Sequence, residues 1–549
     1  MVEPRLTQQW YVNMKDFASK ALSAVEDREV VFYPDNMRNM YHTWLREENV
    51  RDWCISRQLW WGQQIPAWYL AGSDEPFVAE TEEEALKMAQ EKTKNPNLTL
   101  KDLKREEDVV DTWFSSWLWP ISVFDGFENQ EELKYYYPTN VLVTGWDIMF
   151  FWVARMIMAG YEWSPELLGK GENFPFKDVF FTGMVRDKDR KKMSKSLGNS
   201  PDALTLIENY GADGVRFGML SCTSAGNDII FDAPKDRETG KTLNESQLCG
   251  QGSKFCNKMW NALKLIKGFK VEEKPANEIS ALATNWFENR LEQATVEVNR
   301  NLDNYRLSDA ILTLYKLIWN DFCSAYLEYI KPGKEEAMSK ETYDKTIQFF
   351  EKQMALLHPF MPFITEEIWH QLKERQAGED CVVSNYPKAQ SFDTAIVEKM
   401  AQAQTLISKI RETRDANGLS PRDSYPLTYE VNESTEALLG ISGMKNIIIK
   451  MANLSGLTIA STTSGIGFVS GAEKYYLEAE ITIDVSAKKA ELEGELKRQQ
   501  GLVIGSKKKL SNERFVQNAP AAVVDREKKK LSDGLSRIKI IEESLKSLN

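Results

Sequence analysis

The pattern of apolar and polar positions changes several times along the chain, and each change predicts a different kind of structure. An apolar run at residues 141–144, an apolar helix-like segment at 147–160 and a second apolar run at 178–183 follow one another closely. A strand, a helix and a strand in this order are typical of a βαβ unit, whose two strands lie parallel in one sheet. We therefore predict an α/β part built on a parallel sheet for this region.

The pattern turns helical after this region. Long amphipathic runs predict a helical bundle from residue 244 to about residue 376, and short β-rich pieces at 425–483 predict a small α/β segment. The end of the chain is helical again, with two stretches of heptad spacing joined by Asn518-Ala-Pro520. This repeat predicts an antiparallel coiled coil, although glycines such as Gly494 and Gly534 each disfavour a helix by about 1 kcal/mol.

Composition and charge narrow the class of protein. A chain of 549 residues is too long for one hydrophobic core, and no apolar run reaches the ~20 residues that a membrane span needs. The polar start lacks the features of a signal peptide, so the cytoplasm is the expected location. The net charge of −12 argues against indiscriminate nucleic-acid binding, but residues 485–549 hold 15 lysines and arginines against 9 acidic residues. A locally basic surface is therefore expected at the end of the chain.

Cysteine and histidine usage gives little support to metal or histidine chemistry. The six cysteines are scattered and none forms a C-x-x-C pair, so neither a structural zinc nor a disulfide framework is expected. The chain contains only three histidines, which disfavours a catalytic mechanism that depends on histidine. We therefore expect no metal ligands among the site residues.

The sharpest local signal is the run Lys192-Met-Ser-Lys-Ser196, which lies just after the second predicted strand. Two lysines on a loop of small residues at the carboxyl edge of a parallel sheet can converge on a polyphosphate. Their ammonium groups would stabilise the charge that develops on a pyrophosphate leaving group during attack at the α-phosphorus. The competing interpretation is a solvated basic turn, which the position after a strand makes weaker.

This run resembles the second signature of class I aminoacyl-tRNA synthetases, and the resemblance covers nearly the whole chain. Segment 52–58 is similar to one shared by the valyl, isoleucyl and leucyl enzymes, and its continuation Leu59-Trp-Trp-Gly62 resembles the valyl enzymes in particular. The segment Leu356-Leu-His-Pro-Phe-Met-Pro-Phe363 resembles their anticodon-binding helices. The implied parts are a connective segment with re-entry into the catalytic domain at 1–130, the second half of a Rossmann catalytic domain at 131–243, a helical anticodon-binding domain at 244–395, a small α/β segment at 396–483 and a coiled-coil tRNA-binding arm at 484–549.

The resemblance assigns roles to residues of a nucleotide site. Lys192 and Lys195 match the signature lysines that grip the ATP phosphates and the transition state, and they are the expected catalytic residues. Gly145 would let the backbone approach the nucleotide, and the Asp147 carboxylate would hold a ribose hydroxyl, with a helix N-cap as its alternative role. The implied ATP-binding residues are Gly145, Asp147, Lys192, Met193, Ser194, Lys195 and Ser196.

An amino-acid pocket is implied by the same resemblance. Trp113 and Ile148 match positions where an indole wall and a β-branched side chain limit the cavity to the size of valine. Trp152 lies one helical turn beyond Ile148 and is expected to pack under the pocket. Without the resemblance, a position in the core would be the better interpretation of each of these side chains.

Two sets of tRNA contacts are also implied. A helix at the start of the anticodon-binding region would present amide and ammonium groups to splayed anticodon bases, with a solvated helix face as the alternative. Its residues are Lys254, Asn257, Lys258 and Asn261. Two lysine runs near the turn of the terminal hairpin would contact tRNA phosphates, with a solubilising charge run as the alternative. These are Lys507, Lys508, Lys509, Lys528, Lys529 and Lys530.

The function that the resemblance implies is ATP-dependent ligation of valine to its tRNA through valyl-adenylate. ATP would bind as its Mg²⁺ complex, no membrane would be involved, and the complete enzyme would be a monomer. However, the His-x-Gly-His signature of the class occurs nowhere in the sequence. We therefore expect the chain to lack the first half of the Rossmann fold and the editing domain, and to be catalytically incomplete alone.

Two other functions stay open at this point. An isoleucyl-tRNA synthetase fragment is the alternative within the class, and Leu59-Trp-Trp together with the terminal hairpin counts against it. A non-catalytic tRNA-binding module is the alternative from another class. A tRNA-binding module would describe the isolated chain if its tRNA-recognition domains function without catalysis.

Overall fold

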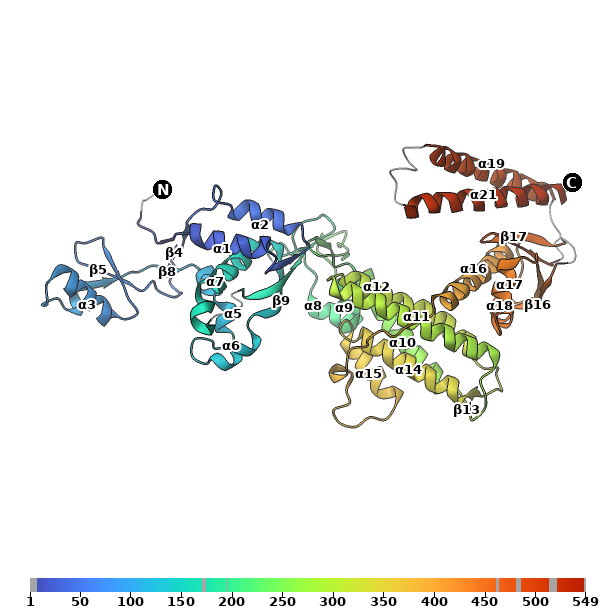
Figure 1. Ribbon diagram of the computed structural model, residues 1–549, viewed down its shortest axis with the longest axis horizontal. Coiled ribbons are helices and arrows are strands. Elements are labelled where there is room, and N and C mark those ends of the chain that lie inside the picture. Colours follow the sequence, from blue (N-terminus) through green and yellow to red (C-terminus); the bar gives the residue numbers. More distant parts are fainter. Residues whose placement is uncertain are drawn as a thin grey trace. The chain divides into compact units, whose positions relative to one another are not determined.

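The computed structural model describes residues 7–169, 174–194, 196–460, 464–479, 485–512 and 521–547. The chain divides into two compact units (Figure 1). The first comprises residues 1–202, 222–246 and 304–308, and the second comprises residues 203–221, 247–303 and 309–549. Within the described ranges, no helix is both long and apolar enough to cross a membrane.

The first unit is built on a three-stranded parallel sheet. Its order is β2 (Val31–Tyr33), β10 (Phe176–Thr182) and β9 (Thr139–Gly145), so β10 is central and β9 lies at an edge. Val179 of β10 pairs with Phe32 on one side and with Leu142 on the other. The parallel arrangement of β9 and β10 confirms the predicted βαβ unit.

Helices pack against this sheet around one apolar core. The chain leaves β9 through a 3₁₀ turn, η2 (Trp146–Ile148), and a π-helical segment, η3 (Met149–Val153), into α7 (Ala154–Leu168). α7 lies beside α1 (Lys15–Glu26), and α2 (Met37–Leu45) contacts α1 in turn. The core that they share includes the buried sheet residues Phe32, Val179 and Phe181.

The rest of the first unit consists of short elements. A three-stranded antiparallel sheet with its own small core around Trp68 and Phe77 carries α3 (Glu82–Thr93), whose first turn is capped by Thr81. Its strands are β6 (Pro76–Val78), β5 (Ala67–Leu70) and β7 (Leu103–Arg105).

The remaining elements of the first unit are three pairs of short strands and several short helices. The strand pairs are β1 (Tyr11–Val12) with β3 (Trp53–Cys54), β4 (Ser56–Arg57) with β8 (Val109–Val110), and β11 (Val185–Arg186) with β12 (Ile229–Ile230). The helices are η1 (Leu100–Asp102), α4 (Thr112–Ser116), α5 (Trp119–Ser122) and α6 (Gln130–Tyr136).

The second unit begins with a helical bundle, as the amphipathic pattern predicts. Within it, α9 (Ala212–Ser221) packs against α10 (Gln247–Lys267). Glycines make this approach possible, because a Cβ on Gly252 would meet the Gly214 carbonyl oxygen at 2.6 Å. The other bundle elements are α8 (Ala203–Tyr210), α11 (Glu278–Asp303), α12 (Leu307–Lys316), η4 (Leu317–Tyr326), α13 (Leu327–Ile330), α14 (Lys340–Leu357), α15 (Pro362–Leu372), η5 (Cys381–Val383) and α16 (Thr394–Ala416), with the short strands β13 (Val271–Glu272) and β14 (Met338–Ser339).

A small α/β segment follows the bundle. Its sheet has the order β16 (Leu454–Ile459), β15 (Tyr425–Tyr429), β18 (Glu473–Leu477) and β17 (Ile466–Ser470). β15 and β16 are parallel, and the connection between them contains α17 (Glu433–Leu439) and α18 (Met444–Ala452).

The chain ends in a pair of long helices, α19 (Val485–Leu510) and α21 (Ala521–Ser547). They run antiparallel, since Ser506 Oγ lies 3.2 Å from Glu527 Oε2 while Arg537 Nη2 lies 3.2 Å from Glu495 Oε1 further along. The heptad residues Val503 and Val524 are buried between them. The predicted turn at 518–520 lies outside the described residues.

Candidate functional site

The carboxyl ends of β9 and β10 form the edge on which the predicted nucleotide site depends. The two strands end together, with Gly145 paired to Thr182. A Cβ added to Gly145 would meet Asp147 Oδ1 at 2.6 Å, so a larger residue at 145 would displace the carboxylate. The absence of a side chain at position 145 thus leaves the Asp147 carboxylate room to lie close to the backbone.

Asp147 is not a helix N-cap. It lies inside the 3₁₀ turn η2, whose N-cap residue is Gly145, and no side chain caps this turn. Its carboxylate instead faces the lysine loop, where Lys192 Nζ lies 3.5 Å from Asp147 Oδ2. Both side chains are partly open to solvent, and such a pair is weak enough for a ligand to insert between the two charges.

Backbone bonds shape the loop that carries Lys192. The loop begins after β11, and Arg186 and Lys192 face each other in an isolated antiparallel bridge. The Met193 amide donates to the Val185 carbonyl at 3.0 Å, which closes the loop at its base. The predicted loop is therefore a short hairpin that returns the chain toward the end of β9.

Asn199 holds the second half of this loop, and sequence reasoning did not assign it a role. Its side-chain amide nitrogen donates to the Lys192 carbonyl and to Asp187 Oδ2, both at 3.1 Å, and its Oδ1 accepts from the Ser194 amide at 2.9 Å. Asn199 and Asp187 are both buried. The signal that could have revealed Asn199 is an amide side chain on a turn, since such side chains bond locally to the backbone.

Asp187 fixes the first half of the loop. Its Oδ1 accepts from the amides of Asp189 and Lys191 at 3.0 and 2.9 Å. Burial opposes ionisation of Asp187, but the hydrogen bonds from the Lys191 amide and from Asn199 outweigh it, so the pKa of this carboxyl lies below its ordinary value. The carboxylate is therefore ionised at neutral pH and keeps accepting these bonds.

A second brace joins the loop to the end of β9. Asp228 accepts from Arg186, from the Met184 amide at 3.0 Å and from Trp146 Nε1 at 3.4 Å. The hydrogen bond from Arg186 is the main reason that the pKa of Asp228 lies below its ordinary value. This brace links the start of the lysine loop to the turn that contains Asp147.

Among the other predicted loop residues that the structure describes, Ser196 is exposed and Ser194 is partly exposed. Ser194 Oγ lies 3.2 Å from Ser196 Oγ and accepts from the Leu197 amide at 3.3 Å, so the serines support the turn. Met193 is partly exposed. Lys195 lies outside the described residues.

The predicted amino-acid pocket residues lie around η3. The Trp113 ring stacks on Phe151 with the ring centres 6.0 Å apart, and the Trp113 amide donates to Asp111, which caps α4. Trp152 donates from Nε1 to the Ser116 carbonyl at 3.1 Å, which ties η3 to α4. Ile148 ends the turn η2 directly before η3, and all three predicted side chains are partly buried.

A cluster of charged residues holds Asp111, which in turn orients Trp113. The sequence did not predict this cluster. The Arg155 guanidinium lies over the Trp53 ring at 3.4 Å, and Asp111 accepts from Trp53 Nε1 at 3.0 Å and from Arg57 at 2.8 Å. Burial lowers the pKa of Arg155 to about 10, which leaves it charged at neutral pH. The cluster fixes Asp111, and Asp111 in turn fixes the amide of Trp113.

The four predicted contacts on α10 share one face of that helix. Lys254, Asn257 and Asn261 are exposed, and Lys258 is partly exposed with its Nζ 5.6 Å from the Trp319 ring centre. The opposite face buries Phe255 and Met259. The structure thus offers an exposed polar face, with a cation held beside an aromatic ring.

The six lysines of the terminal hairpin are all exposed and lie near the ends of α19 and α21 that face the connecting turn. Lys509 and Lys530 both pair with the buried Glu527, and Lys528 lies 3.8 Å from Asp525. Lys507, Lys508 and Lys529 take part in no ion pair with the described residues, so their charges are available to a ligand.

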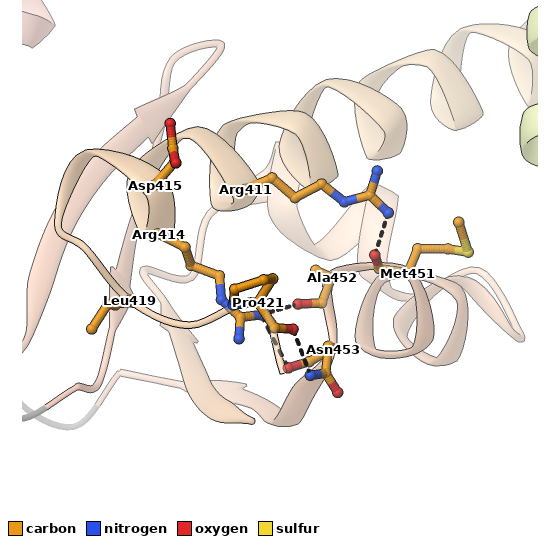
Figure 2. A pocket seen from close by; sticks show the side chains of 8 residues that line it. All are labelled: Arg411, Arg414, Asp415, Leu419, Pro421, Met451, Ala452 and Asn453. Atoms are coloured by element: carbon orange, nitrogen blue, oxygen red, sulfur yellow. Dashed lines mark hydrogen bonds between the residues drawn. The ribbon is translucent and has the colours of Figure 1, made fainter. Parts of the chain in front are cut away.

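A pocket of about 360 Å³ lies elsewhere, between α16 and the end of α18 (Figure 2). Arg414 donates to the carbonyls of Ala452 at 2.6 Å and of Ser420 at 3.0 Å, and Arg411 donates to the Met451 carbonyl at 2.5 Å. These arginines therefore satisfy the carbonyls that the end of α18 leaves without helical partners. We assign them a structural role.

Three stretches of the chain match described protein families. Residues 2–232 match the family of class I tRNA synthetases for I, L, M and V, residues 284–430 match an anticodon-binding domain of tRNA ligase, and residues 484–549 match the valyl tRNA synthetase tRNA binding arm. The first match includes the lysine loop and the sheet edge, and the last includes the helical hairpin.

Individual bacterial proteins are similar along the whole chain. The chain is 46% identical to the valine–tRNA ligases of Parabacteroides distasonis and Bacteroides fragilis, and 38% identical to that of Fusobacterium nucleatum. Each comparison covers 100% of this chain and 60% of the relative, so the chain spans about 60% of the length of these relatives. A solved LeuRS–tRNA–LeuAMS complex from Agrobacterium radiobacter is 19% identical, with a TM-score of 0.46 over 64% of this chain and 43% of that one.

Proposed function

We propose, from the premise that the chain belongs to the valyl-tRNA synthetase family, that its first unit holds ATP during the activation of valine. The observation that supports this most directly is the Lys192 ammonium group, 3.5 Å from Asp147 at the carboxyl edge of the parallel sheet. A nucleotide bound across this edge would have its ribose beside the Asp147 carboxylate and its phosphates beside the lysine loop.

In the proposed reaction, a carboxylate oxygen of valine forms a bond to the α-phosphorus of ATP while the bond from that phosphorus to pyrophosphate breaks. The ammonium groups of Lys192 and Lys195 stabilise the negative charge that pyrophosphate gains as it leaves. Mg²⁺ enters with ATP as part of the substrate and offsets phosphate charge. A ribose hydroxyl of the tRNA then attacks the carbonyl carbon of valyl-adenylate and releases AMP.

The choice of valine depends, in this proposal, on the three side chains around η3. The indole of Trp113 is oriented by its stack on Phe151 and by the cap that Asp111 provides, so it can serve as a rigid wall. Ile148 would limit the depth of the cavity, and Trp152 would support it through its bond to Ser116. A rigid apolar wall discriminates by size and gives about 1–3 kcal/mol per methylene.

The proposed partner of the second unit is the valine tRNA. The polar face of α10 would contact anticodon bases, because single-stranded bases are recognised by amides, cations and aromatic rings. The exposed lysines of the hairpin would contact tRNA phosphates. We place the protein in the cytoplasm, with a complete enzyme that acts as a monomer.

The chain is proposed to provide only part of this activity. It spans about 60% of the length of its relatives and contains no His-x-Gly-His signature. We assign that signature to the part of the relatives that this chain does not match. We therefore expect no ATP–pyrophosphate exchange with valine by the chain alone. Exchange at a rate above that of the Lys192→Ala variant would contradict this expectation.

The proposal is tested by salt-titrated binding of the purified chain to a valine tRNA transcript, with an isoleucine tRNA as competitor. We expect at least about tenfold preference for the valine tRNA and a steep loss of affinity with salt, because phosphate contacts release counterions. Equal affinity for the two transcripts would contradict valine specificity and favour the isoleucyl alternative or a general tRNA-binding module.

That module is the second candidate function, and the 60% coverage favours it for the isolated chain. It predicts tRNA binding without any ATP binding. Measuring ATP affinity by equilibrium dialysis separates the two candidates, because only the ligase proposal requires the sheet edge and the lysine loop to bind nucleotide.

A further inference from the structure

Three groups that commonly bind metal ions converge where α15 meets the segment before η5. Glu366 and His370 lie one helical turn apart on α15, and Asp380 directly precedes η5. His370 Nε2 lies 3.3 Å from Glu366 Oε1 and 3.0 Å from Asp380 Oδ1, and the three ligand atoms all lie within 4.8 Å of one another. The cluster has no part in the proposed ligation chemistry.

The spacing of these atoms suits a tetrahedral ion. Zinc–nitrogen and zinc–oxygen bonds are about 2.0–2.2 Å long, so neighbouring ligand atoms around zinc lie roughly 3.3–3.5 Å apart. The two separations around His370 Nε2 are 3.0 and 3.3 Å, and the two carboxylates lie within 4.8 Å of each other, so an ion can enter after small side-chain movements. One imidazole and two carboxylates with a solvent molecule would complete four-fold coordination.

Backbone groups orient the central carboxylate. Glu366 Oε1 accepts from the Cys381 amide at 2.7 Å, and its Oε2 accepts from the Val382 amide at 3.1 Å. His358, whose Nδ1 is bonded to Thr365 Oγ1 at 2.8 Å, places its Nε2 3.8 Å from Glu366 Oε2 on the other side. Metal-binding carboxylates are typically held by such outer hydrogen bonds, which fix the ligand before the ion arrives.

The charge balance of the cluster also favours a cation. Among the described residues, the ion-pair partners of Glu366 and Asp380 are histidines alone. The nearby cations Lys373 and Arg375 both pair with Glu351 instead. With neutral imidazoles, two carboxylate charges about a hydrogen-bond length from one nitrogen stay uncompensated, and a divalent ion would compensate both.

We propose that Glu366, His370 and Asp380 bind a divalent transition-metal ion, with Zn²⁺ as the best match to one imidazole and two carboxylates. The bound ion fastens the segment before η5 to α15. The competing explanation is a protonated His370 that bridges the two carboxylates without metal.

The test is calorimetric titration of the purified 549-residue chain with Zn²⁺, compared with the His370→Ala and Asp380→Asn variants. We expect one Zn²⁺ site that loses affinity by at least about tenfold in either variant, since each removes a ligand. His42→Ala is the matched control, because His42 forms a histidine–carboxylate pair with Glu26 and lies in the other unit. It should leave the Zn²⁺ titration unchanged.

The absorption spectrum of bound Co²⁺ distinguishes binding at this site from binding to the six free cysteines. A cluster of nitrogen and oxygen ligands gives a four-coordinate Co²⁺ spectrum without the thiolate charge-transfer band, and His370→Ala should abolish it. Either the absence of Zn²⁺ binding by the unmodified chain or equal binding by the His370→Ala chain would overturn the proposal. Both results are independent of whether the chain binds ATP or tRNA.

Discussion

At the scale of single residues, Lys192 reaches Asp147 because buried neighbours hold the loop that carries it. Asn199 bonds to both sides of the loop, and Asp187 accepts from two of its amides. Preorganised cations are effective at a developing charge because little rearrangement is needed when the charge appears. The position of Lys192 is thus determined partly by the buried side chains of Asn199 and Asp187.

Replacing Lys192 with alanine should weaken ATP binding to the chain by at least about tenfold. A hydrogen bond from a charged group contributes about 1.5–3 kcal/mol, which corresponds to roughly tenfold to a hundredfold in affinity. Lys191→Ala is the matched control, since Lys191 is an exposed neighbour that supports the loop only through its backbone. Equilibrium dialysis with ATP measures the difference, and equal affinities of the two variants would count against the assignment.

The Asn199→Ala chain should be cut by trypsin after Lys191 and Lys192 at least about tenfold faster than the unmodified chain. Three hydrogen bonds of about 0.5–1.5 kcal/mol each disappear, and cleavage follows the population of the opened loop. Mass spectrometry of timed digests identifies the cut sites. Asn227→Ala, which removes one exposed loop bond to Ser224, should leave these sites protected, and the opposite result would refute the role of Asn199.

At the scale of elements, the helix pair α9 and α10 depends on the absence of side chains at specific glycines. A Cβ on Gly252 would collide with the Gly214 backbone, while a Cβ on Gly250 of the same helix would meet only a Tyr210 ring atom at 3.6 Å. The two glycines therefore have different structural roles although both lie in α10.

Gly252→Ala should lower the free energy of unfolding by about 1–3 kcal/mol, because the two helices must move apart. Gly250→Ala should be neutral or raise it by up to about 1 kcal/mol, since alanine is the better helix former. Urea unfolding followed by circular dichroism measures both. A loss of stability in Gly250→Ala as large as in Gly252→Ala would show that packing is not the cause.

The terminal hairpin should contribute to the salt dependence of tRNA binding. Replacing Lys507, Lys508 and Lys509 with alanine should lower the slope of log affinity against log salt by roughly one for each lysine that neutralises a phosphate. Three exposed lysines of the first unit, Lys87, Lys94 and Lys101, provide a triple-alanine control of equal charge. An unchanged slope in the hairpin variant would mean that its lysines only increase solubility.

The sequence predicted those elements whose signal is local. The runs at 141–144 and 178–183 became β9 and β10, because apolar strands flanked by a helix have few other arrangements. The third strand, β2, was missed because it is only three residues long and its partner is far along the chain. The heptads predicted the burial of Val503 and Val524.

Within the candidate site, sequence similarity suggested candidate ligand-binding residues but not the residues that support them. Lys192 and Asp147 were predicted, and the structure brings their charges together. Asn199 and Arg155 were not assigned, because their roles arise from burial and from contacts with residues distant in sequence. Tertiary contacts of this kind leave no periodic pattern to detect.

At the scale of the whole molecule, the first unit exposes several large apolar side chains. Trp60 and Trp61 are 107% and 91% exposed, and Val143 on the edge strand β9 is 59% exposed. Parallel sheets normally have both faces and their central strands covered.

Replacing Trp60 and Trp61 together with serine should reduce self-association of the chain without changing its fold, because neither side chain is buried. Sedimentation velocity over a range of concentrations measures the association, and circular dichroism checks the fold. Tyr135 and Tyr136, also exposed and adjacent, provide a double-serine control on the same unit. Equal association of all three proteins would show that the tryptophan pair is not an adhesive surface.

The order of strands in the main sheet also has a consequence for synthesis on the ribosome. β2 pairs with β10 although about 150 residues separate them in the chain, so β2 emerges long before its partner. At about 5–20 residues per second, that delay lasts roughly 7–30 s. During this interval β2 lacks its partner strand, and the three-stranded sheet cannot assemble until residues 176–182 have been synthesised.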